Sequence, residues 1–400
     1  MSTQTAASVL DVLVVGAGPT GLMLAGDLAA AGVRVVVLDR ADEPVRTPKG
    51  NGVVGRAVLE LRRRGLLRGT GLRVLRPPRF RFGPLTLALG LLHGPLHVLP
   101  VPQHRLESLL AQRAARLGAT LRRGHEVTGF EQDDDGVTVR ATADGSPVEL
   151  RARYLVGCDG ARSFVRKSLG IGFPGVTSPD ISRLARVTIP AGAAARVGDH
   201  IELPGIGRLV PFRPNRTAHG SITIAPADAL DRSAPHDLYI VSTHEPRGDS
   251  DPTDELGDEE LRASLRRVLG AELPYTTAFA ARSVVANSRH AERYREGRVL
   301  LAGDAAHIFS AGGSAINAGL LDAVALGRTL ATVLRGAAGQ TALDDYESQR
   351  RAAARRTLAL TRLQVALEAG DETGEALREV LGELLRNRAT ARRIATLIEG

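Results

Sequence analysis

The chain has 400 residues, 43% of them hydrophobic and 24% charged, which suffices for one large globular domain or for two to three ordinary ones. The net charge of +8 does not indicate nucleic-acid binding, because aromatic residues make up only 3% and the basic residues are spread along the chain. Only Lys49 and Lys167 are lysines, a preference for arginine that, with abundant Ala and Gly, is typical of GC-rich coding DNA. We therefore expect no nucleic-acid partner.

Cysteine usage and hydropathy indicate the cellular compartment of the protein. The single cysteine, Cys158, excludes a disulfide within one chain and fits a reducing cytoplasm. The first ten residues have neither the basic region nor the apolar core of a secretion signal. The most apolar later stretch, residues 84–101, carries internal prolines and histidines that disfavour a membrane helix and suit sheet or loop. We expect a cytoplasmic protein with no membrane partner.

The first informative stretch is an apolar run, residues 11–15, that ends in the pattern G-x-G-x-x-G at Gly16, Gly18 and Gly21. It predicts a buried parallel strand that turns into a helix over residues 22–31. The glycines allow, in turn, a tight turn, close approach of a pyrophosphate and close packing of helix on strand. Free N–H groups and partial positive charge at the helix N-terminus then favour a diphosphate, so a dinucleotide is the predicted ligand.

A second apolar run, residues 33–38, ends at Asp39. Asp39 stands about 20 residues after the last glycine, where the dinucleotide fingerprint places the carboxylate that accepts ribose hydroxyls. The complete strand–helix–strand–acid unit is a far stronger signal than the glycines alone. In the loop that follows, Arg46 and Lys49 are either contacts to a flavin or phosphate or ordinary surface charges.

Two helices and a hairpin are predicted next. Apolar residues at helical spacing indicate helices over residues 56–64 and 105–117, each followed by a glycine. Two alternating runs, residues 125–130 and 136–141, flank an Asp-rich turn and indicate a hairpin.

A second strand-to-helix junction follows. A buried strand over residues 154–158 runs into an Asp-Gly turn at Asp159, and the next helix carries Arg162, Arg166 and Lys167. A strand end that offers N–H groups and cations suits phosphates, although Asp-Gly after a strand is by itself more often only a turn.

Beyond Pro174 the pattern changes to short strand-like runs over residues 188–224 and 238–243, broken by Pro and Gly and followed by a helix over 258–269. This pattern predicts a mostly antiparallel sheet with a covering helix, inserted between two parts of the nucleotide domain. Its face is the natural wall for a substrate, although most residues on strand surfaces are structural. The candidates to line this wall are Arg208, Phe212, Arg213 and His219.

The third junction joins a strand over residues 298–302 to Gly303 and Asp304, then to a small-residue loop and a long helix that starts near 314–317. The helix N-terminus would favour an anion, and Asp304 at a strand end suits the hydroxyls of a sugar or sugar alcohol. His307 is either an acid–base group or, as is commoner beside such loops, a structural hydrogen-bonding residue. From residue 344 on, the chain is helical with a break near 370–374, and it packs on the nucleotide domain or forms an oligomer surface.

Taken together, these junctions resemble the FAD-dependent aromatic hydroxylases of the para-hydroxybenzoate hydroxylase type, especially the bacterial hydroxylases that tailor aromatic polyketide antibiotics. The resemblance covers nearly the whole chain. Its motifs are GAGPTG with LDR within residues 16–40, CDGARSFVRKSLG at 158–170 and GRVLLAGDAAH at 297–307. Three motifs in this order are highly specific.

The resemblance implies an α/β fold with three parts. A discontinuous Rossmann-like FAD-binding domain of the GR2 type spans residues 1–175 and 277–343. The inserted, mostly antiparallel β-sheet substrate domain spans residues 176–276, and a C-terminal helical segment spans residues 344–400. The thioredoxin-like C-terminal extension of several relatives is not expected.

The resemblance also assigns cofactor contacts, with the diphosphate at the first turn, the adenosine ribose at Asp39 and the path of NAD(P)H near Asp159. Gln103 and Arg105 match the segment that reaches toward the flavin. The expected FAD-binding residues are Gly16, Gly18, Pro19, Thr20, Gly21, Asp39, Arg40, Lys49, Gln103, Arg105, Val127, Asp159, Gly303, Asp304, Gly312, Gly313, Ser314, Ala315 and Asn317.

Two departures from the family pattern stand out. The loop HIFSAGGSAIN at residues 307–317 is one residue shorter, lacks the proline, and has Ser314 and Ala315 where Gln and Gly are usual. Lys49 replaces an arginine of many relatives.

The implied activity is monooxygenation of an aromatic, phenolic or polyketide substrate, in which NADPH or NADH, with NADPH preferred, reduces non-covalently bound FAD. O₂ then adds to give a flavin C4a-hydroperoxide. No catalytic base and no metal site is assigned, and we expect a monomer or homodimer. One alternative, an NAD(P)-dependent dehydrogenase, is disfavoured because a single dinucleotide unit leaves the second and third junctions unexplained. The other, a flavoprotein of this fold acting as a non-redox cyclase, reductase or partner, is supported only by the altered loop.

Overall fold

The computed structural model describes residues 10–44, 52–90, 96–229, 233–248, 256–310 and 314–399. The chain divides into two compact units, Met1–Gly175 with Ser288–Gly400, and Val176–Asn287. The resemblance implies a return to the first unit at residue 277, whereas the two compact units divide at residue 288. The reason is that strand β18 (Thr277–His290) is continuous and belongs for most of its length to the second unit.

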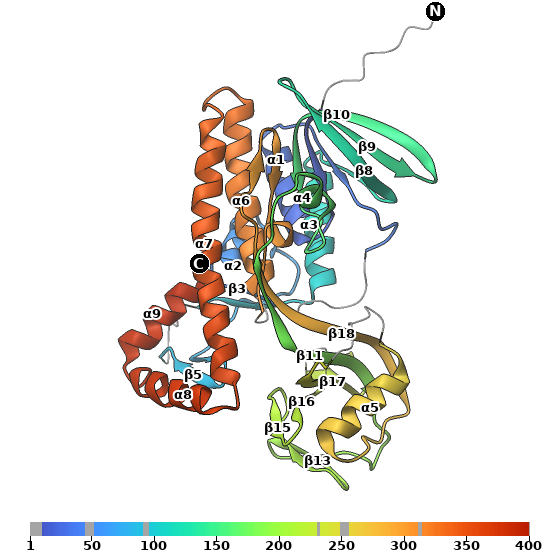
Figure 1. The fold of residues 1–400 in the computed structure, drawn as a ribbon, viewed down its shortest axis with the longest axis vertical. Helices are drawn as coiled ribbons and strands as arrows, with labels where there is room; N and C mark the ends of the chain where they lie inside the picture. The colour runs from blue at the N-terminus through green and yellow to red at the C-terminus, as the bar shows by residue number, and fades with distance from the viewer. Residues whose placement is uncertain are drawn as a thin grey trace, which may run out of the picture. The chain divides into compact units, whose positions relative to one another are not determined.

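The first unit is built on an eight-stranded sheet with the path β19-β20-β10-β1-β2-β7. The strands on this path are β1 (Leu10–Val15), β2 (Val35–Leu38), β7 (Thr120–Arg122), β10 (Ser146–Gly157), β19 (Arg295–Glu296) and β20 (Val299–Leu301). Along this path the neighbours from β7 to β20 are parallel and β19 is antiparallel to β20, while the two strands off the path, β8 and β9, pair antiparallel. The predicted hairpin is β8 (His125–Gln132) and β9 (Val137–Ala143), and β9 pairs with the first half of β10 (Figure 1).

The core of this unit follows from its β-branched runs, because a parallel strand covered on both faces needs apolar residues at every position. Residues 12–14 of β1 and 299–301 of β20 are fully buried. Helix α1 (Pro19–Ala30) packs against α3 (Gln103–Arg116) and α6 (Ser314–Leu334). Helix α6 is long and apolar enough to cross a membrane, but Leu320, Leu326 and Leu330 are fully buried in this core, which accounts for its composition.

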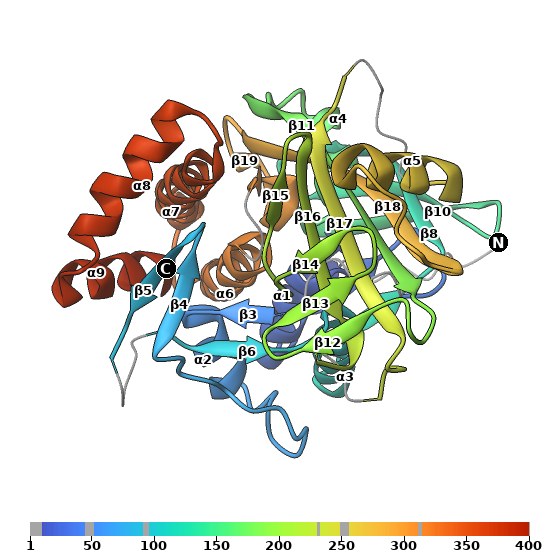
Figure 2. The ribbon, with the colours of Figure 1, turned by 90° about the horizontal axis from the view of Figure 1, so that it is seen from below.

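The C-terminal helices α7 (Thr341–Glu368), α8 (Glu372–Leu384) and α9 (Arg388–Glu399) belong to the first unit. They begin three residues before the predicted boundary at 344. With the hairpin of β4 (Arg79–Phe82) and β5 (Leu85–Ala88) they enclose a separate cluster, which we call the C-terminal core (Figure 2). It consists of Phe82, Leu87, Leu89, Leu96, Leu367, Leu385, Ala391 and Ala395.

Short elements complete the first unit: β3 (Gly52–Val54), α2 (Arg56–Arg63), β6 (Val98–Pro100), α4 (Phe164–Ser168) and β21 (His307–Ile308). Strand β3 pairs with β6. The end of α9 is tied to this region, since Glu399 Oε1 accepts the His97 N–H at 2.8 Å.

The second unit contains a sheet with the order β15-β16-β17-β11-β18 and a helix, α5 (Asp258–Leu269), in agreement with the predicted antiparallel architecture. Its other strands are β11 (Gly175–Thr188), β15 (Asn215–Thr217), β16 (Gly220–Pro226) and β17 (Leu238–Pro246). A three-stranded sheet of β12 (Ala195–Val197), β13 (His200–Leu203) and β14 (Gly207–Leu209) lies beside them. The core of the unit joins Ile222, Ile224 and Val241 of the larger sheet to Leu261 and Leu265 of α5.

Candidate functional site

The three junctions singled out in the sequence follow neighbouring parallel strands. Val15 is in register with Gly157, and Gly157 is in register with Leu301. The ladder continues one residue further, because the Cys158 N–H donates to the Val15 carbonyl at 2.7 Å and the Ala302 N–H donates to the Gly157 carbonyl at 3.0 Å. The three strands therefore end side by side at the carboxyl edge of the sheet, where open α/β sheets bind their ligands.

The turns that leave this edge begin at Gly16, Cys158 and Gly303, and we call them together the turn edge. At the first turn, Gly16 has φ +104°, and a Cβ there would lie 2.4 Å from the Cys158 carbonyl oxygen. A Cβ at Gly21 would lie 2.0 Å from the Gly16 carbonyl oxygen. Both glycines are thus required by the packing of the protein itself.

Gly18 differs from its two neighbours. Its backbone is extended, with φ −75°, and a Cβ there would meet nothing within 4 Å. Gly18 is the N-cap of α1, makes no side-chain cap, and precedes a first turn without an acidic residue. The open space and the uncapped N–H groups at a positive helix end fit a diphosphate.

Asp39 is held at the end of β2 by the backbone beside the first turn. Its Oδ2 accepts the Ala17 N–H at 2.6 Å, and its Oδ1 accepts the Ala41 N–H at 2.9 Å. A carboxylate has about four acceptor positions, so each oxygen retains capacity for a hydroxyl group. The half-buried carboxylate fits a ribose, while the neighbouring Arg40 is exposed.

The third turn is the short 3-10 helix η2 (Gly303–Ala305), which lies against the start of α1. Gly303 has φ +65°, and a Cβ there would lie 2.6 Å from Thr20 Oγ1. The side chain of Asp304 is exposed, whereas Gly303 and Ala305 are buried. The structure thus brings Thr20 and the Gly-Asp motif together.

A fully buried carboxylate fixes this turn from behind. Asp322 Oδ2 accepts the Gly303 N–H at 3.0 Å and lies 2.6 Å from His307 Nε2, while Oδ1 accepts Arg350 Nε–H at 2.6 Å. Burial alone raises the pKa of Asp322, but the charges and hydrogen bonds of His307 and Arg350 outweigh it and lower the pKa to about 2. The Asp322 carboxylate is therefore ionised and anchors the turn through the backbone.

His307 is part of this anchor. Its side chain is fully buried, and because a carboxylate only accepts hydrogen bonds, Nε2 carries the hydrogen donated to Asp322. The structure favours the structural interpretation of His307 over the acid–base one.

The second turn contains a correction. Arg166 was expected among cations that suit a phosphate, but its guanidinium is buried and donates to the carbonyls of Ala305 at 2.9 Å and Ala161 at 3.0 Å. It also lies 3.8 Å from the centroid of the Phe173 ring. Arg166 therefore links the second and third turns. Asp159 accepts Ser163 Oγ–H at 2.5 Å and the Val165 N–H at 3.1 Å, which shapes the turn itself.

The other expected cofactor residues lie in several places. Asn317 in the first turn of α6 accepts the Val54 N–H at 2.8 Å, so it fastens β3 to that helix. Gln103 bonds to Glu107 within α3, and Arg105 donates to the Thr70 carbonyl. The role of these residues toward FAD stays a prediction, as does that of Pro19 at the start of α1, buried Val127 of β8, and Ser314 and Ala315 at the start of α6. Lys49, Gly312 and Gly313, with Arg46, lie outside the described residues.

In the second unit, the four predicted wall residues lie outside the larger sheet. Arg208 of β14 is 73% exposed and pairs with Glu202 at 2.9 Å. Phe212 and Arg213 are exposed in the turn before β15, and His219 is exposed in the turn before β16. Their contact with a substrate stays a prediction.

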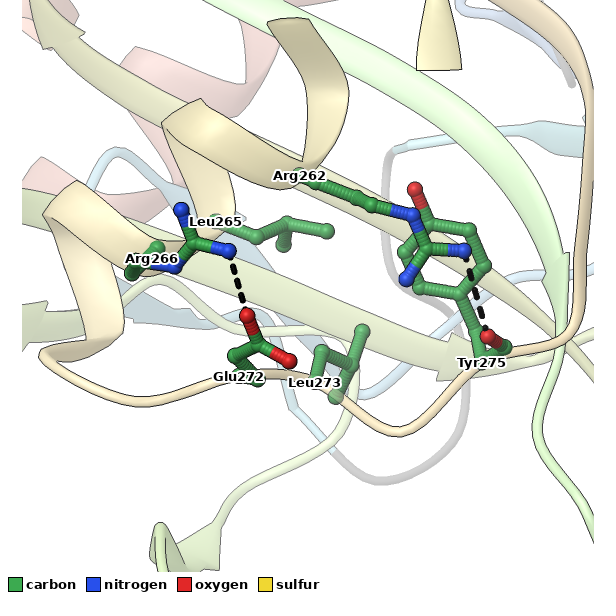
Figure 3. A pocket seen from close by; sticks show the side chains of 6 residues that line it. All are labelled: Arg262, Leu265, Arg266, Glu272, Leu273 and Tyr275. Carbon is green, nitrogen blue, oxygen red and sulfur yellow. Dashed lines mark hydrogen bonds and ion pairs between the residues drawn. The ribbon is translucent and has the colours of Figure 1, made fainter. Parts of the chain in front are cut away.

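A small pocket of the second unit lies between α5 and the loop that precedes β18 (Figure 3). Arg262 lies 4.1 Å from the centroid of the Tyr275 ring, Arg266 pairs with Glu272, and the Tyr275 hydroxyl donates to Asp258 at 2.7 Å. These groups satisfy one another, so we read the pocket as part of the packing of α5.

Comparison with known proteins gives three findings. Residues 9–361 match the family described as FAD binding domain. The chain is 42% identical over 400 residues to the 12-dehydrotetracycline 5-monooxygenase/anhydrotetracycline 6-monooxygenase of Streptomyces rimosus, a match that covers 97% of this chain and 76% of the relative.

Two solved structures are similar over the same extent. An anhydrotetracycline hydroxylase from Streptomyces rimosus has a TM-score of 0.82 at 39% identity, covering 98% of this chain and 76% of that one. A Diels-Alderase from the biosynthetic pathway of pyrroindomycins also has a TM-score of 0.82, at 34% identity, covering 97% of this chain and 80% of that one.

Proposed function

Because this chain belongs to the family with this FAD-binding domain, and to its FAD-dependent monooxygenases, we propose that it uses NADPH and O₂ to oxygenate an aromatic polyketide or a related phenol. The observation that carries the proposal is the turn edge, where three distant motifs meet beside the uncapped start of α1 and the open space at Gly18. FAD, when bound, supplies the redox and oxygen chemistry. The buried, unpaired Cys158 supports a reducing cytoplasm as the place of action.

Different residues of the turn edge would bind different parts of FAD. The N–H groups at the start of α1 would hold the diphosphate, Asp39 would accept the adenosine ribose hydroxyls, and Asp304 would accept those of the ribityl chain. Asp322 would keep the third turn in place through the Gly303 N–H. The start of α6, which has no acidic residue in its first turn, would favour an anionic group of the cofactor.

The second unit would bind the substrate through the sheet face opposite α5, which we call the distal face. Strand register places three rows of residues across β16, β17 and β11 on this face. The rows are Ser221–His244–Ser182, Thr223–Ser242–Leu184 and Ala225–Ile240–Arg186. Apolar side chains next to hydroxyl groups suit a flat, hydroxylated aromatic molecule.

The purified protein tests the proposal in two steps. We expect it to be yellow with bound flavin and to oxidise NADPH faster than NADH. Anhydrotetracycline and simpler hydroxylated anthraquinones should accelerate that oxidation, and ¹⁸O₂ should label the product in mass spectrometry. A colourless protein that takes up no FAD would contradict the cofactor assignment.

A second candidate function is a non-redox cyclisation, favoured by the similarity to a Diels-Alderase at 34% identity. It predicts bound FAD without any NADPH oxidation and without ¹⁸O in the product. Label in the product excludes it.

A further inference from the structure

On the distal face, two polar side chains of β11 lie close to His244 of β17. Ser182 of β11 stands opposite His244 of β17, and Ser182 Oγ lies 3.0 Å from His244 Nδ1. Asp180, two residues earlier on β11 and on the same face, has its Oδ2 3.3 Å from His244 Nε2. Ser221 of β16 flanks His244 on the other side.

The hydrogen-bond directions follow from the chemistry of the groups. A carboxylate only accepts hydrogen bonds, so the tautomer of His244 that suits the Asp180 contact carries its hydrogen on Nε2. Nδ1 then accepts from the Ser182 hydroxyl. This is the order of groups in which a hydroxyl is activated by an imidazole and the imidazole is oriented by a carboxylate.

The groups are accessible. The side chain of His244 is 50% exposed and that of Asp180 is 37% exposed. The opposite face of β17 is different, because Val241 and Thr243 on it are fully buried under α5. An imidazole on the distal face therefore meets a ligand that lies on this face.

We propose that Ser182, His244 and Asp180 form a proton relay that removes the proton from a phenolic hydroxyl of the substrate. The substrate O–H bond breaks and its proton passes to Ser182 Oγ, while the proton of Ser182 passes to His244 Nδ1. The products are a phenolate and an imidazolium that is paired with the Asp180 carboxylate. No oxidant or reductant takes part, and the phenolate ring is the more electron-rich partner for oxygen transfer.

Several charged groups lie on the strands around His244. On its own face the charged residues are Asp180 and Arg186 of β11 and Arg216 of β15, since Arg216 is in register with Ser221. Strand β16 contributes no charged residue, and β18, the other neighbour of β11, carries Arg282, Arg289 and His290. The Asp180 carboxylate, 3.3 Å away, is the closest of these charges to the imidazole.

The relay rests on the proposed function, and its test uses the 400-residue protein loaded with FAD. The probe is alizarin, a dihydroxyanthraquinone whose absorption moves to longer wavelength when it loses a phenolic proton. In the unaltered protein we expect bound alizarin to ionise about 1 pH unit lower than free alizarin. His244→Asn and Ser182→Ala should abolish this shift, and Asp180→Asn should reduce it.

The matched control is His236→Asn. His236 belongs to the same unit, is exposed and pairs with Asp228 at 2.6 Å, but it lies outside the rows of the distal face. This variant should keep the shift of the unaltered protein. Flavin content and thermal unfolding establish that each variant is folded, and any one folded relay variant decides the test.

The outcomes separate the two proposals. If His244→Asn ionises alizarin at the same pH as the unaltered protein, the relay is wrong, even where ¹⁸O₂ labelling supports a monooxygenase. If His244→Asn abolishes the shift of the unaltered protein but neither protein introduces ¹⁸O into anhydrotetracycline or alizarin, the monooxygenase proposal fails and the relay stands. If neither alizarin nor anhydrotetracycline binds, both the relay and the substrate class are overturned.

Discussion

The turn edge of the first unit and the distal face of the second are built in opposite ways. The turn edge is formed mainly by backbone. Gly16 and Gly303 adopt positive φ, and the neighbouring main chain leaves no room for a side chain at Gly16. On the distal face the backbone is regular strand, and chemistry resides in side chains such as His244 and Ser182. The first kind of site leaves a fixed pattern of glycines in the sequence, and the second leaves only polar residues at alternate positions.

The contrast indicates which of the two sites tolerates amino-acid substitution. A residue that replaces Gly16 must displace the neighbouring strand end, whereas a residue that replaces His244 alters one partly exposed side chain. A fold of this kind keeps its cofactor site while its substrate chemistry varies.

The largest loss of stability is expected from a substitution in the first turn. In Gly16→Ala the new Cβ would lie 2.4 Å from the Cys158 carbonyl oxygen at a φ of +104°, so we expect a loss of about 3 kcal/mol or more in the free energy of unfolding. Urea unfolding measures it. Gly18→Ala is the matched control, because its Cβ meets nothing within 4 Å and its φ is allowed. The control should keep its stability but bind FAD about tenfold more weakly or worse, by fluorescence titration. Equal stability losses in both variants would contradict the distinction drawn between the two glycines.

The next largest effect is expected at the buried anchor. Asp322→Asn leaves Arg350 without its buried partner, so the free energy of unfolding should fall by about 3 kcal/mol at neutral pH. The pKa of Asp322 is lowered from 3.8 to about 2, so its contribution is present above pH 4 and is lost as the pH falls through about 2. The difference in the free energy of unfolding between the unaltered protein and the variant, measured by urea unfolding, should therefore become smaller below pH 4. A difference that stays constant from pH 6 to pH 3 would refute this assignment.

A smaller loss of stability is expected at Glu245 of β17 in the second unit. Glu245 is buried and accepts from Arg183 at 2.6 Å, Arg267 at 2.9 Å and Ser264 at 2.5 Å. Burial raises the pKa of Glu245, but the bonds to Arg267 and Ser264 outweigh it and the pKa is lowered. Glu245→Gln should cost about 2 kcal/mol of stability. Glu260 also pairs with Arg183, but its side chain is 46% exposed. Glu260→Gln should therefore lower the free energy of unfolding by less than about 1 kcal/mol. Urea unfolding measures both variants.

The smallest effect is expected at Arg208. Its guanidinium is 73% exposed and paired with a surface carboxylate, so Arg208→Ala should change stability by less than about 0.5 kcal/mol. Alizarin binding distinguishes the two views of the substrate wall. An unchanged dissociation constant favours the distal face, and a tenfold increase would restore the predicted role of Arg208.

The sequence predicts the turn edge well because each of its parts has a local cause. The apolar run before Gly16, the acid at Asp39 and the Gly-Asp pair at Gly303 are all recognisable within short windows. Their meeting at one edge also follows, because parallel strands end together. The fold class and the α5 helix are predicted for the same reason, since amphipathic spacing over 258–269 is local.

What the sequence does not reveal depends on partners far along the chain. Asp322 is one acid in a long helix, and only the fold brings Gly303, His307 and Arg350 to it. The structural role of Arg166 is hidden for the same reason, because its carbonyl acceptor at Ala305 is distant in sequence. On the distal face, His244 lies opposite Ser182 only once the register of β11 and β17 is known. Strand alternation gives the face of each residue but not its neighbour on the next strand.

Helix α7 reaches two places that its sequence gives no reason to associate. Near its start, Arg350 holds Asp322 behind the third turn, and near its end, Leu367 is fully buried in the C-terminal core. At 1.5 Å per residue these positions are about 25 Å apart on one uninterrupted rod. Helix α7 therefore connects the packing of α8, α9 and the β4–β5 hairpin to the residues that anchor the third turn. Under the proposed function, substitutions in the C-terminal core would change flavin affinity without altering any residue proposed to contact FAD.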